Sequence, residues 1–171
     1  MRDITIKALE SDEEIRQKAF VSYKGWQEAY GKILDQSFLD TLTYERNLKN
    51  AAAWKDMTII AKDDDNVIGF AVCGPCRDED HRDAGEVYAL YILKAYYDQK
   101  VGYRLMQAAL DRLAAYPEVI IWVLKENKRA IRFYQRCGFQ FDGMEKELPL
   151  GKPVWDARMI LLPGGDRSDD N

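Results

Sequence analysis

The pattern of hydrophobic and polar residues predicts a series of strands. Residues 4–8 alternate between apolar and polar side chains, which is typical of a strand with one buried face. The runs 86–93 and 119–124 are apolar almost throughout, so we expect strands covered on both faces. The turn-forming segment 63–66 joins two more strands in a hairpin. The other predicted strands are 57–62, 66–74, 139–147 and 153–162, the last two separated by Pro149, Gly151 and Pro153.

Between these strands the apolar residues recur at helical spacing. Ser11 and Glu14 have the spacing of a capping box, so a helix is predicted to begin there and to run towards Tyr23. The segment 26–54 is helical but interrupted. The predicted boundary residues are Ser37 and Thr43 as caps in that segment, Gly102 and Pro117 at the two ends of a later helix, and Gly138 after a short basic helix.

The order of elements defines the fold class. It is strand, helices, three strands, helix, strand, helix and two strands. Strand–helix–strand connections imply parallel pairing, and hairpins imply antiparallel pairing. We therefore predict an α/β (α+β) fold with a mixed, mostly antiparallel central sheet of about seven strands, flanked by helices. Residues 1–163 form a single domain in this prediction, and the Gly-, Ser- and Asp-rich residues 164–171 form a disordered tail.

The overall charge and the cysteine content argue against several classes of protein. A net charge of −4 gives no basic field, so we expect no nucleic-acid partner and no binding to an anionic membrane. The N-terminal residues contain no apolar stretch typical of a signal peptide. No apolar run is long enough to span a bilayer. Three cysteines leave one unpaired, which argues against a disulfide framework and indicates a cytoplasmic protein with reduced thiols.

The stretch Cys73-Gly74-Pro75-Cys76 has the spacing of a thiol redox motif. Such a motif needs its first cysteine at the start of a helix, where the thiol pKa falls, but here it ends a strand and acidic residues follow. Zinc takes four ligands, whereas Cys73, Cys76 and His81 supply three and Cys137 is distant in sequence. We expect Cys73 in the core, His81 in a solvated loop and no metal. A redox function stays open as an alternative.

Residues 86–110 have the pattern of a phosphate-binding helix start. A buried strand leads through a loop to Gly102 and a helix, so backbone N–H groups would point outward at the positive end of the helix. Lys100 and Arg104 add positive charge. The alternative is that Gly102 only permits a tight turn and that the basic residues form a solvated face.

A second segment, 122–139, contains polar candidate site residues between apolar positions of a strand and a helix. A strand leads to Asn127, and the helix that follows contains Tyr134 and ends before Gly138. The alternative is an ordinary amphipathic helix with Tyr134 in the core. That alternative explains the apolar spacing of the helix, but it does not explain the pairing with the first segment.

Together the two segments resemble the GNAT family of N-acetyltransferases, which transfer an acetyl group from acetyl-CoA to an amine. The stretch LYILKAYYDQKVG is similar to the family's L-Y-V-x-P-x-Y-Q-x-x-G-x-G. In this register Tyr97 replaces the usual Gln or Arg, Lys100 replaces the first Gly, and Gly102 is kept as the final Gly. A shifted register would place Gln99 at the Gln or Arg position, Gly102 at the first Gly and Arg104 at the final Gly. The family's second motif, N-x-x-A-x-x-x-Y-x-x-x-G-F, is complete, with Asn127, Ala130, Tyr134, Gly138 and Phe139.

The resemblance implies roles for individual residues. Tyr134 protonates the departing CoA thiolate, and Glu86, or a water that it polarises, removes a proton from the amine. A backbone N–H near Tyr91 or Ile92 binds the oxyanion. Acetyl-CoA is the co-substrate, and the chemistry requires no metal. Its implied contacts are the strand backbone at Leu90 and Ile92 for the pantetheine arm, Asn127 for the cofactor or the helix start, and Tyr97, Gln99, Lys100, Val101, Gly102 and Tyr103 for the pyrophosphate.

The expected acceptor is the primary amine of a small molecule or a peptide. By resemblance, Trp26 and Tyr30 wall its site, with core packing as the alternative for Trp26. An acidic run either attracts the cationic amine or belongs to a solvated loop. A CoA-binding sensor or scaffold without turnover fits the same motifs, and a homodimer stays open as the oligomeric state. The acidic run consists of Asp78, Glu79, Asp80 and Asp83.

Overall fold

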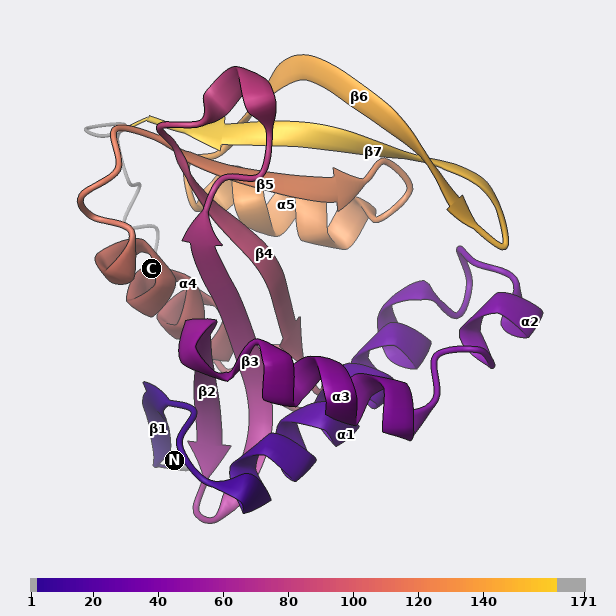
Figure 1. Ribbon diagram of the computed structural model, residues 1–171, viewed down its shortest axis with the longest axis vertical. Coiled ribbons are helices and arrows are strands. Elements are labelled where there is room, and N and C mark those ends of the chain that lie inside the picture. The colour runs from indigo at the N-terminus through magenta and orange to yellow at the C-terminus, as the bar shows by residue number, and fades with distance from the viewer. Residues whose placement is uncertain (1–2, 163–171) are drawn as a thin grey trace.

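A seven-stranded sheet forms the centre of the molecule, with the strand order β1-β2-β3-β4-β5-β7-β6 (Figure 1). In the computed structural model, which describes residues 3–162, β4 and β5 pair in parallel and the other neighbours pair antiparallel. This arrangement confirms the predicted fold class. The predicted tail lies outside the described residues, and the domain boundary at 163 stays a prediction. The strands are β1 (Ile4–Ala8), β2 (Thr58–Asp63), β3 (Asn66–Pro75), β4 (Gly85–Ile92), β5 (Val119–Leu124), β6 (Gln140–Leu150) and β7 (Lys152–Leu161).

Helices cover both faces of the sheet (Figure 1). Helices α4 and α5 pack on one face, while α1 and α3 cross the other face. None of the helices within residues 3–162 is long and apolar enough to cross a membrane. The helices are α1 (Asp12–Tyr30), α2 (Gln36–Leu39), α3 (Tyr44–Ala53), α4 (Val101–Arg112) and α5 (Lys128–Arg136), with short 3-10 turns at Lys55–Met57 (η1), Glu79–His81 (η2) and Lys94–Tyr96 (η3).

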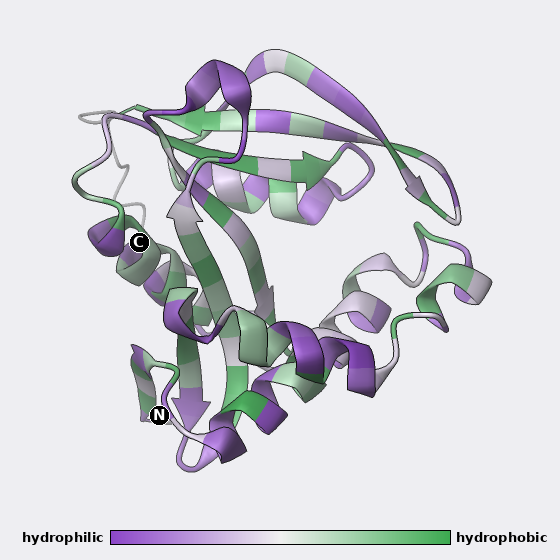
Figure 2. Ribbon diagram, viewed as in Figure 1, coloured by the Kyte–Doolittle hydropathy of each residue, from purple (hydrophilic) through white to green (hydrophobic). Residues whose placement is uncertain are grey.

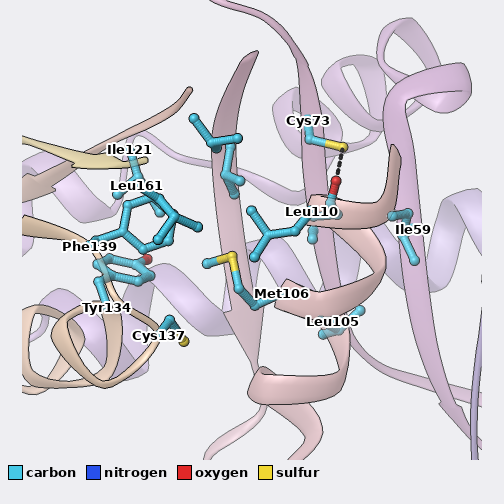
Figure 3. Close-up of a cluster of buried hydrophobic side chains, with 14 of the residues drawn as sticks. Ile59, Cys73, Leu105, Met106, Leu110, Ile121, Tyr134, Cys137, Phe139 and Leu161 are labelled. Atoms are coloured by element: carbon cyan, nitrogen blue, oxygen red, sulfur yellow. Dashed lines mark hydrogen bonds between the residues drawn. The ribbon is translucent and has the colours of Figure 1, made fainter. Parts of the chain in front are cut away.

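Each face of the sheet has its own core. On the first face Leu105 and Met106 of α4 pack against β3 and β5 (Figure 3). On the second face Ala19 of α1 and Ala51 of α3 pack with Phe70 of β3. Figure 2 shows the same division, because β3 and β4 are largely hydrophobic whereas the η2 segment between them is hydrophilic. The strands therefore carry the core and their connections face water.

Several predicted helix ends are confirmed by hydrogen bonds. Ser11 and Glu14 form the predicted capping box at α1, and Thr43 caps α3. Gly138 follows α5 with a φ of +101°, which favours glycine. The prediction of Ser37 as a cap was wrong, because α2 begins after Asp35.

Two helix lengths differ from the predictions. Helix α1 runs past Tyr23 to Tyr30, because Gly25 lets the helix lie closely against β4: a Cβ at this position would be 3.1 Å from Cδ1 of Tyr91. Tertiary packing thus compensates for the weak helix propensity of glycine. Helix α4 ends at Arg112, well before Pro117, and Leu113 then packs tightly on Gly85 at the start of β4.

The final hairpin also differs from the prediction. Pro149 and Pro153 do not separate β6 from β7 but lie inside the two strands as opposed partners. The turn itself centres on Gly151, whose φ of +80° is in the region that favours glycine. Gly151 also lies close to Phe38 of α2, since an added Cβ would be 2.6 Å from Cβ of Phe38. The tip of the hairpin therefore rests on α2.

The pairing of β4 with β5 stops after three residues. Gly85–Val87 pairs with Val119–Ile121, and both strands continue beyond this point without pairing to each other. The register of the β3–β4 pairing shifts directly after Val87, the last residue of β4 that pairs with β5. Such an irregularity bends the strand, so β4 turns away from β5. Figure 1 shows the two strands diverging. We expected 86–93 to be covered throughout, but residues 88–92 are only half-buried because they border the opening between the strands.

Candidate active site

A cavity of about 1360 Å³ occupies the opening between β4 and β5. The C-terminal end of α1, the loop 94–100, the start of α4 and the helix α5 complete its walls. The cavity is larger than a typical drug-sized pocket, so it suits an extended ligand. Nine of the predicted site residues line it: Leu90, Tyr91, Ile92, Tyr97, Lys100, Gly102, Tyr103, Asn127 and Tyr134.

Three other predicted site residues do not line this cavity. Gln99 is exposed and its side-chain amide donates to the carbonyl of Ala95. Val101 is fully buried in the core beneath α4, so only its backbone can act in binding. Glu86 is buried at the start of β4.

The start of α4 offers backbone N–H groups to the cavity. Helices α1, α3 and α5 each have a side-chain cap, whereas no side chain caps α4. The first N–H groups of a helix have no intrahelical partner, so those of Val101, Gly102 and Tyr103 are available to a ligand. Together with the helix dipole they favour an anion such as a phosphate.

The loop before α4 adopts the conformation that its sequence makes unfavourable. Lys100 has a φ of 59° and a ψ of 15°, a left-handed conformation that glycine adopts readily and lysine does not. Gly102 has a different role, because it permits close packing: an added Cβ would be 2.8 Å from Cδ1 of Ile92. Arg104, which we expected to add charge to this loop, donates instead to the carbonyl of Ile4.

The walls of the cavity are predominantly basic. Six basic residues and three acidic residues line it, which favours anionic groups of a ligand. The guanidinium of Arg129 in α5 lies 3.5 Å from the ring centroid of Tyr97, so the two sides of the cavity meet there. The basic lining residues are Lys32, Lys94, Lys100, Lys128, Arg129 and Arg136, and the acidic ones are Glu28, Asp98 and Glu126.

The edge of β4 that faces the cavity carries peptide groups without a partner strand. The N–H of Leu93 donates to the carbonyl of Ile68, so it points towards β3. Because successive peptide groups of a strand point to opposite edges, those of Leu90 and Ile92 point towards the cavity. This edge can pair with an extended ligand that contains amide groups.

Three tyrosines approach one another in the middle of the cleft. The hydroxyls of Tyr30 and Tyr91 are 3.2 Å apart, and Asn127 lies near enough to Tyr30 to lower its pKa slightly against the effect of burial. Burial raises the pKa of Tyr134, and the neighbouring Tyr30 and Cys137 raise it further. Burial also raises the pKa of Tyr30 and, more strongly, that of Tyr91. All three phenols are therefore protonated at neutral pH.

Comparison with known proteins identifies the family. The sequence profile of the "Acetyltransferase (GNAT) family" matches residues 20–139. The chain belongs to the GNAT family. It is 30% identical over 166 residues, covering 88% of this chain and 94% of the other, to the uncharacterised N-acetyltransferase YuaI of Bacillus subtilis (strain 168). Over 85 residues, 46% of this chain and 55% of the other, it is 33% identical to the spermine/spermidine N(1)-acetyltransferase of the same strain.

The fold is also that of known GNAT structures. The PaiA N-acetyltransferase of Thermoplasma acidophilum, solved in complex with coenzyme A, superimposes with a TM-score of 0.75 at 19% identity. The match covers 94% of this chain and 99% of that one. The protein is therefore an acetyl-CoA-dependent N-acetyltransferase.

In this GNAT enzyme, Asn127 has the second of its two predicted roles. Its side-chain carbonyl accepts from the N–H of Ala130 and so caps α5. The same helix places Tyr134 in the wall of the cleft. The ring of Tyr134 packs against the ring of Phe139 (Figure 3). The family's second motif therefore builds one wall of the site.

Glu86 is held in an ion pair. Its carboxylate accepts from the backbone N–H of Arg77 and from the Arg77 guanidinium, with a distance of 2.8 Å between Oε2 and Nη2. Only 1% of the Glu86 surface is exposed. The carboxylate is thus neutralised and directed towards the β3–β4 connection.

The surroundings of the thiols argue against a redox site. Cys73 is buried in the core, as predicted, and its thiol points to the carbonyl of Ala109 (Figure 3). Burial raises the pKa of both Cys73 and Cys76, which is opposite to what a reactive thiol needs. Among residues 3–162 no cluster of side chains has the makings of a metal site.

The segment after Cys76 is less solvated than expected. His81 pairs with Glu118. Asp80 binds both Nη atoms of Arg158 at 2.8 Å, and Asp78 accepts from Nη1 of the same arginine at 3.2 Å. Arg158 is only 3% exposed, so these carboxylates compensate a buried cation. They are therefore not free to attract an amine.

The remaining aromatic candidates separate clearly. Tyr30 lines the cavity, whereas Trp26 packs behind it with its ring centroid 4.7 Å from that of Tyr30. Core packing, the alternative for Trp26, is thus the better description. Sequence reasoning missed the lining residues of α5, Lys128, Arg129 and Arg136, although the basic character of this helix was visible.

Proposed function

We propose that this N-acetyltransferase transfers the acetyl group directly from acetyl-CoA to a primary amine, with both substrates bound in the cleft between β4 and β5. One observation carries the proposal: the uncapped start of α4, the free edge of β4 and Tyr134 border the same cavity. The helix start suits a pyrophosphate, the strand edge suits the amides of a pantetheine arm, and the phenol suits a departing thiolate.

The pyrophosphate is assigned to the N–H groups of Val101, Gly102 and Tyr103, with Lys100 beside them. Tyr97 replaces the usual polar residue of the loop, and Arg129 lies against its ring. Arg129 is therefore well placed to supply positive charge on this side of the cleft. Gln99 has no assigned contact, because its side chain points back to the loop.

Direct attack by the amine is favoured over an acetylated enzyme. Cys137 lines the cavity and is the thiol nearest to the chemistry. Burial raises its pKa to about 11, so it is a protonated thiol at neutral pH and a poor nucleophile. The acetyl group therefore passes to the amine within a ternary complex.

Tyr134 is assigned as the acid that protonates the CoA thiolate. Its raised pKa keeps the phenol protonated throughout the neutral range. An N–H on the cavity edge of β4, at Ile92, is assigned to the oxyanion. Glu86 remains a proposed base, but the Arg77 ion pair would have to open before its carboxylate could accept a proton.

The test is release of free CoA thiol from acetyl-CoA in the presence of single amines. The panel includes spermine and spermidine, because a relative carries these names, and peptides with free N-terminal amines. Tyr134→Phe should lower kcat by about 10²–10⁴-fold, the usual worth of general acid catalysis. Tyr116→Phe, a half-buried tyrosine that does not line the cavity, is the matched control and should keep wild-type kcat. A folded Tyr134→Phe enzyme with wild-type kcat would show that this residue is not the acid of the mechanism.

A second candidate function is a CoA-binding sensor without turnover. It is favoured by the altered loop, in which Tyr97 and Lys100 replace the usual residues. The sensor predicts tight CoA binding with no thiol release for any amine, whereas the enzyme predicts release with at least one. Cytoplasmic location and a homodimer stay predictions.

A further inference from the structure

A carboxylate on β7 lies close to the acceptor end of the cleft without a partner of its own. Asp156 is only 9% exposed. No described residue donates a hydrogen bond to it or forms an ion pair with it within 4.0 Å. Its oxygens still reach solvent, because no fully buried side-chain oxygen among the described residues lacks a hydrogen-bond partner, so Asp156 can exchange a proton with water.

The strand register directs Asp156 towards α1. Asp156 pairs with Leu124 on β5, and Arg158 pairs with Trp122. Directly paired side chains share a face of the sheet. Leu124 packs with Tyr30 in the cluster beneath the end of α1. Asp156 therefore lies on the face of the sheet that the acceptor end of the cleft occupies.

The negative charge of Asp156 acts on the tyrosines of the site. It raises the pKa of both Tyr30 and Tyr91, whose hydroxyls are 3.2 Å apart. Tyr30 and Tyr91 both line the cavity, whereas Asp156 does not. The tyrosine pair is thus the part of the cavity wall on which the charge of Asp156 acts.

We propose that Asp156 takes up the proton that the ammonium group of the acceptor must lose, and that the paired hydroxyls of Tyr30 and Tyr91 pass it on through an intervening water, since neither hydroxyl hydrogen-bonds to Asp156 directly. The inference rests on the proposed function and deepens it. It defines the acceptor as a primary alkylammonium ion, which donates to the cavity side of the tyrosine pair. Asp156 acts through the tyrosines, so it is a positioning and proton-accepting residue rather than one that touches the substrate.

Glu86 on β4 and Asp156 on β7 are both buried carboxylates, and their surroundings decide between them. Glu86 is held in an ion pair by Arg77, so its carboxylate is already occupied by a cation. Asp156 has no such partner, and burial raises its pKa, so it accepts a proton more readily. Lys146 on β6 favours the ionised form of Asp156. Arg158 on β7 is already paired with three carboxylates. The other titratable groups around Asp156 are Tyr30 on α1 and Tyr91 on β4.

The protons of the reaction balance in this scheme. The ammonium loses its first proton through the tyrosine pair to Asp156. The amine lone pair then forms the C–N bond at the thioester carbonyl, and the C–S bond breaks as the tetrahedral intermediate collapses. The thiolate takes a proton from Tyr134, and the second nitrogen proton restores that phenol. Asp156 returns its proton to solvent, which accounts for the one proton released per turnover.

The experiment is the pH profile of kcat/KM for the best amine of the panel at saturating acetyl-CoA. The wild-type profile should fall on its acidic side as Asp156 becomes protonated. Asp156→Asn should lower kcat/KM by about 10²-fold or more at neutral pH and remove that acidic limb, while leaving the Kd for CoA unchanged. Tyr30→Phe should cause a similar loss because it interrupts the path, and it provides an independent test if the Asn variant folds poorly.

The outcomes separate this inference from the proposed function. If Asp156 serves only the fold, replacing an unpaired buried carboxylate with Asn should leave the acidic limb in place. That result, or a folded Tyr30→Phe enzyme with wild-type kcat/KM, would overturn the inference while the enzyme itself remains active. A wild-type protein that binds CoA but acetylates no amine would instead overturn the proposed function. Asp111→Asn, on the exposed end of α4, controls for loss of a carboxylate and should match the wild type.

Discussion

Replacement of Lys100 by glycine should raise the stability of the protein and lower its affinity for acetyl-CoA. Lys100 has a φ of 59°, and a left-handed conformation costs a residue with a Cβ about 1–2 kcal/mol. Glycine removes this cost but loses about 0.5–1 kcal/mol of backbone entropy on folding. The net gain in the free energy of unfolding is about 0.5–1 kcal/mol, or about 1–4 °C in Tm for a chain of this size.

The charge of Lys100 has a separate effect on the ligand. Lys100 is exposed beside the uncapped start of α4, so its attraction to a pyrophosphate is about 1 kcal/mol or less. Loss of the ammonium should therefore raise the Kd for acetyl-CoA by no more than about fivefold, since 1.4 kcal/mol corresponds to a factor of ten.

Three control variants separate conformation from charge. Lys100→Asn removes the charge with a residue that tolerates the left-handed region, and Lys100→Ala removes the charge but keeps the strain. Both should weaken binding, but only the Asn variant should approach the stability of the Gly variant. Asp64, in the β2–β3 turn, is the other non-glycine residue at positive φ among the described residues. Asp64→Gly should leave acetyl-CoA binding unaltered.

Urea denaturation and titration calorimetry at pH 7 measure the two effects. A Gly variant that is no more stable than wild type, together with an Ala variant that is equally stable, would refute the strain argument. A wild-type Kd in all three Lys100 variants would instead refute the assignment of the pyrophosphate to this loop.

Other substitutions test the remaining assignments. Gly102→Asp brings a carboxylate to the phosphate site and a Cβ against Ile92, so calorimetry should show at least tenfold weaker acetyl-CoA binding, and unchanged affinity in a folded variant would contradict the site. Changing both Cys73 and Cys76 to Ser should leave kcat unaltered, and loss of activity with an intact circular dichroism spectrum would revive the redox alternative. Lys18 is buried over the ring of Phe70, and burial lowers its pKa from 10.5 to about 8, so the folded state binds fewer protons than the unfolded state between pH 8 and pH 10.5. Lys18→Met should therefore gain about 1–3 kcal/mol at pH 7 and lose this advantage as the pH rises from 8 to 10.5; a gain independent of pH would exclude the charge as its cause.

The sequence by itself determined the features that depend on neighbouring residues. The capping box of Ser11 and Glu14 and the strand at 119–124 lie where the pattern predicts them. The loop to which we assign the pyrophosphate was recognisable from Gly102 and its flanking strand, and the conformation of Lys100 agrees with the register that places it at a glycine position. These signals are local, because a cap or an apolar run involves residues a few positions apart.

Only the tertiary structure decided how distant residues meet. Glycine at 25 should weaken a helix, yet α1 continues because Tyr91 of β4 packs against it. Asp78 reads as a solvated residue, but its partner Arg158 lies 80 positions away along the chain. Asp156 has no local signal, since its importance arises from burial and from tyrosines on two other elements. The ionisation of a side chain depends on the groups that folding brings around it, and no pattern of neighbours along the chain records them.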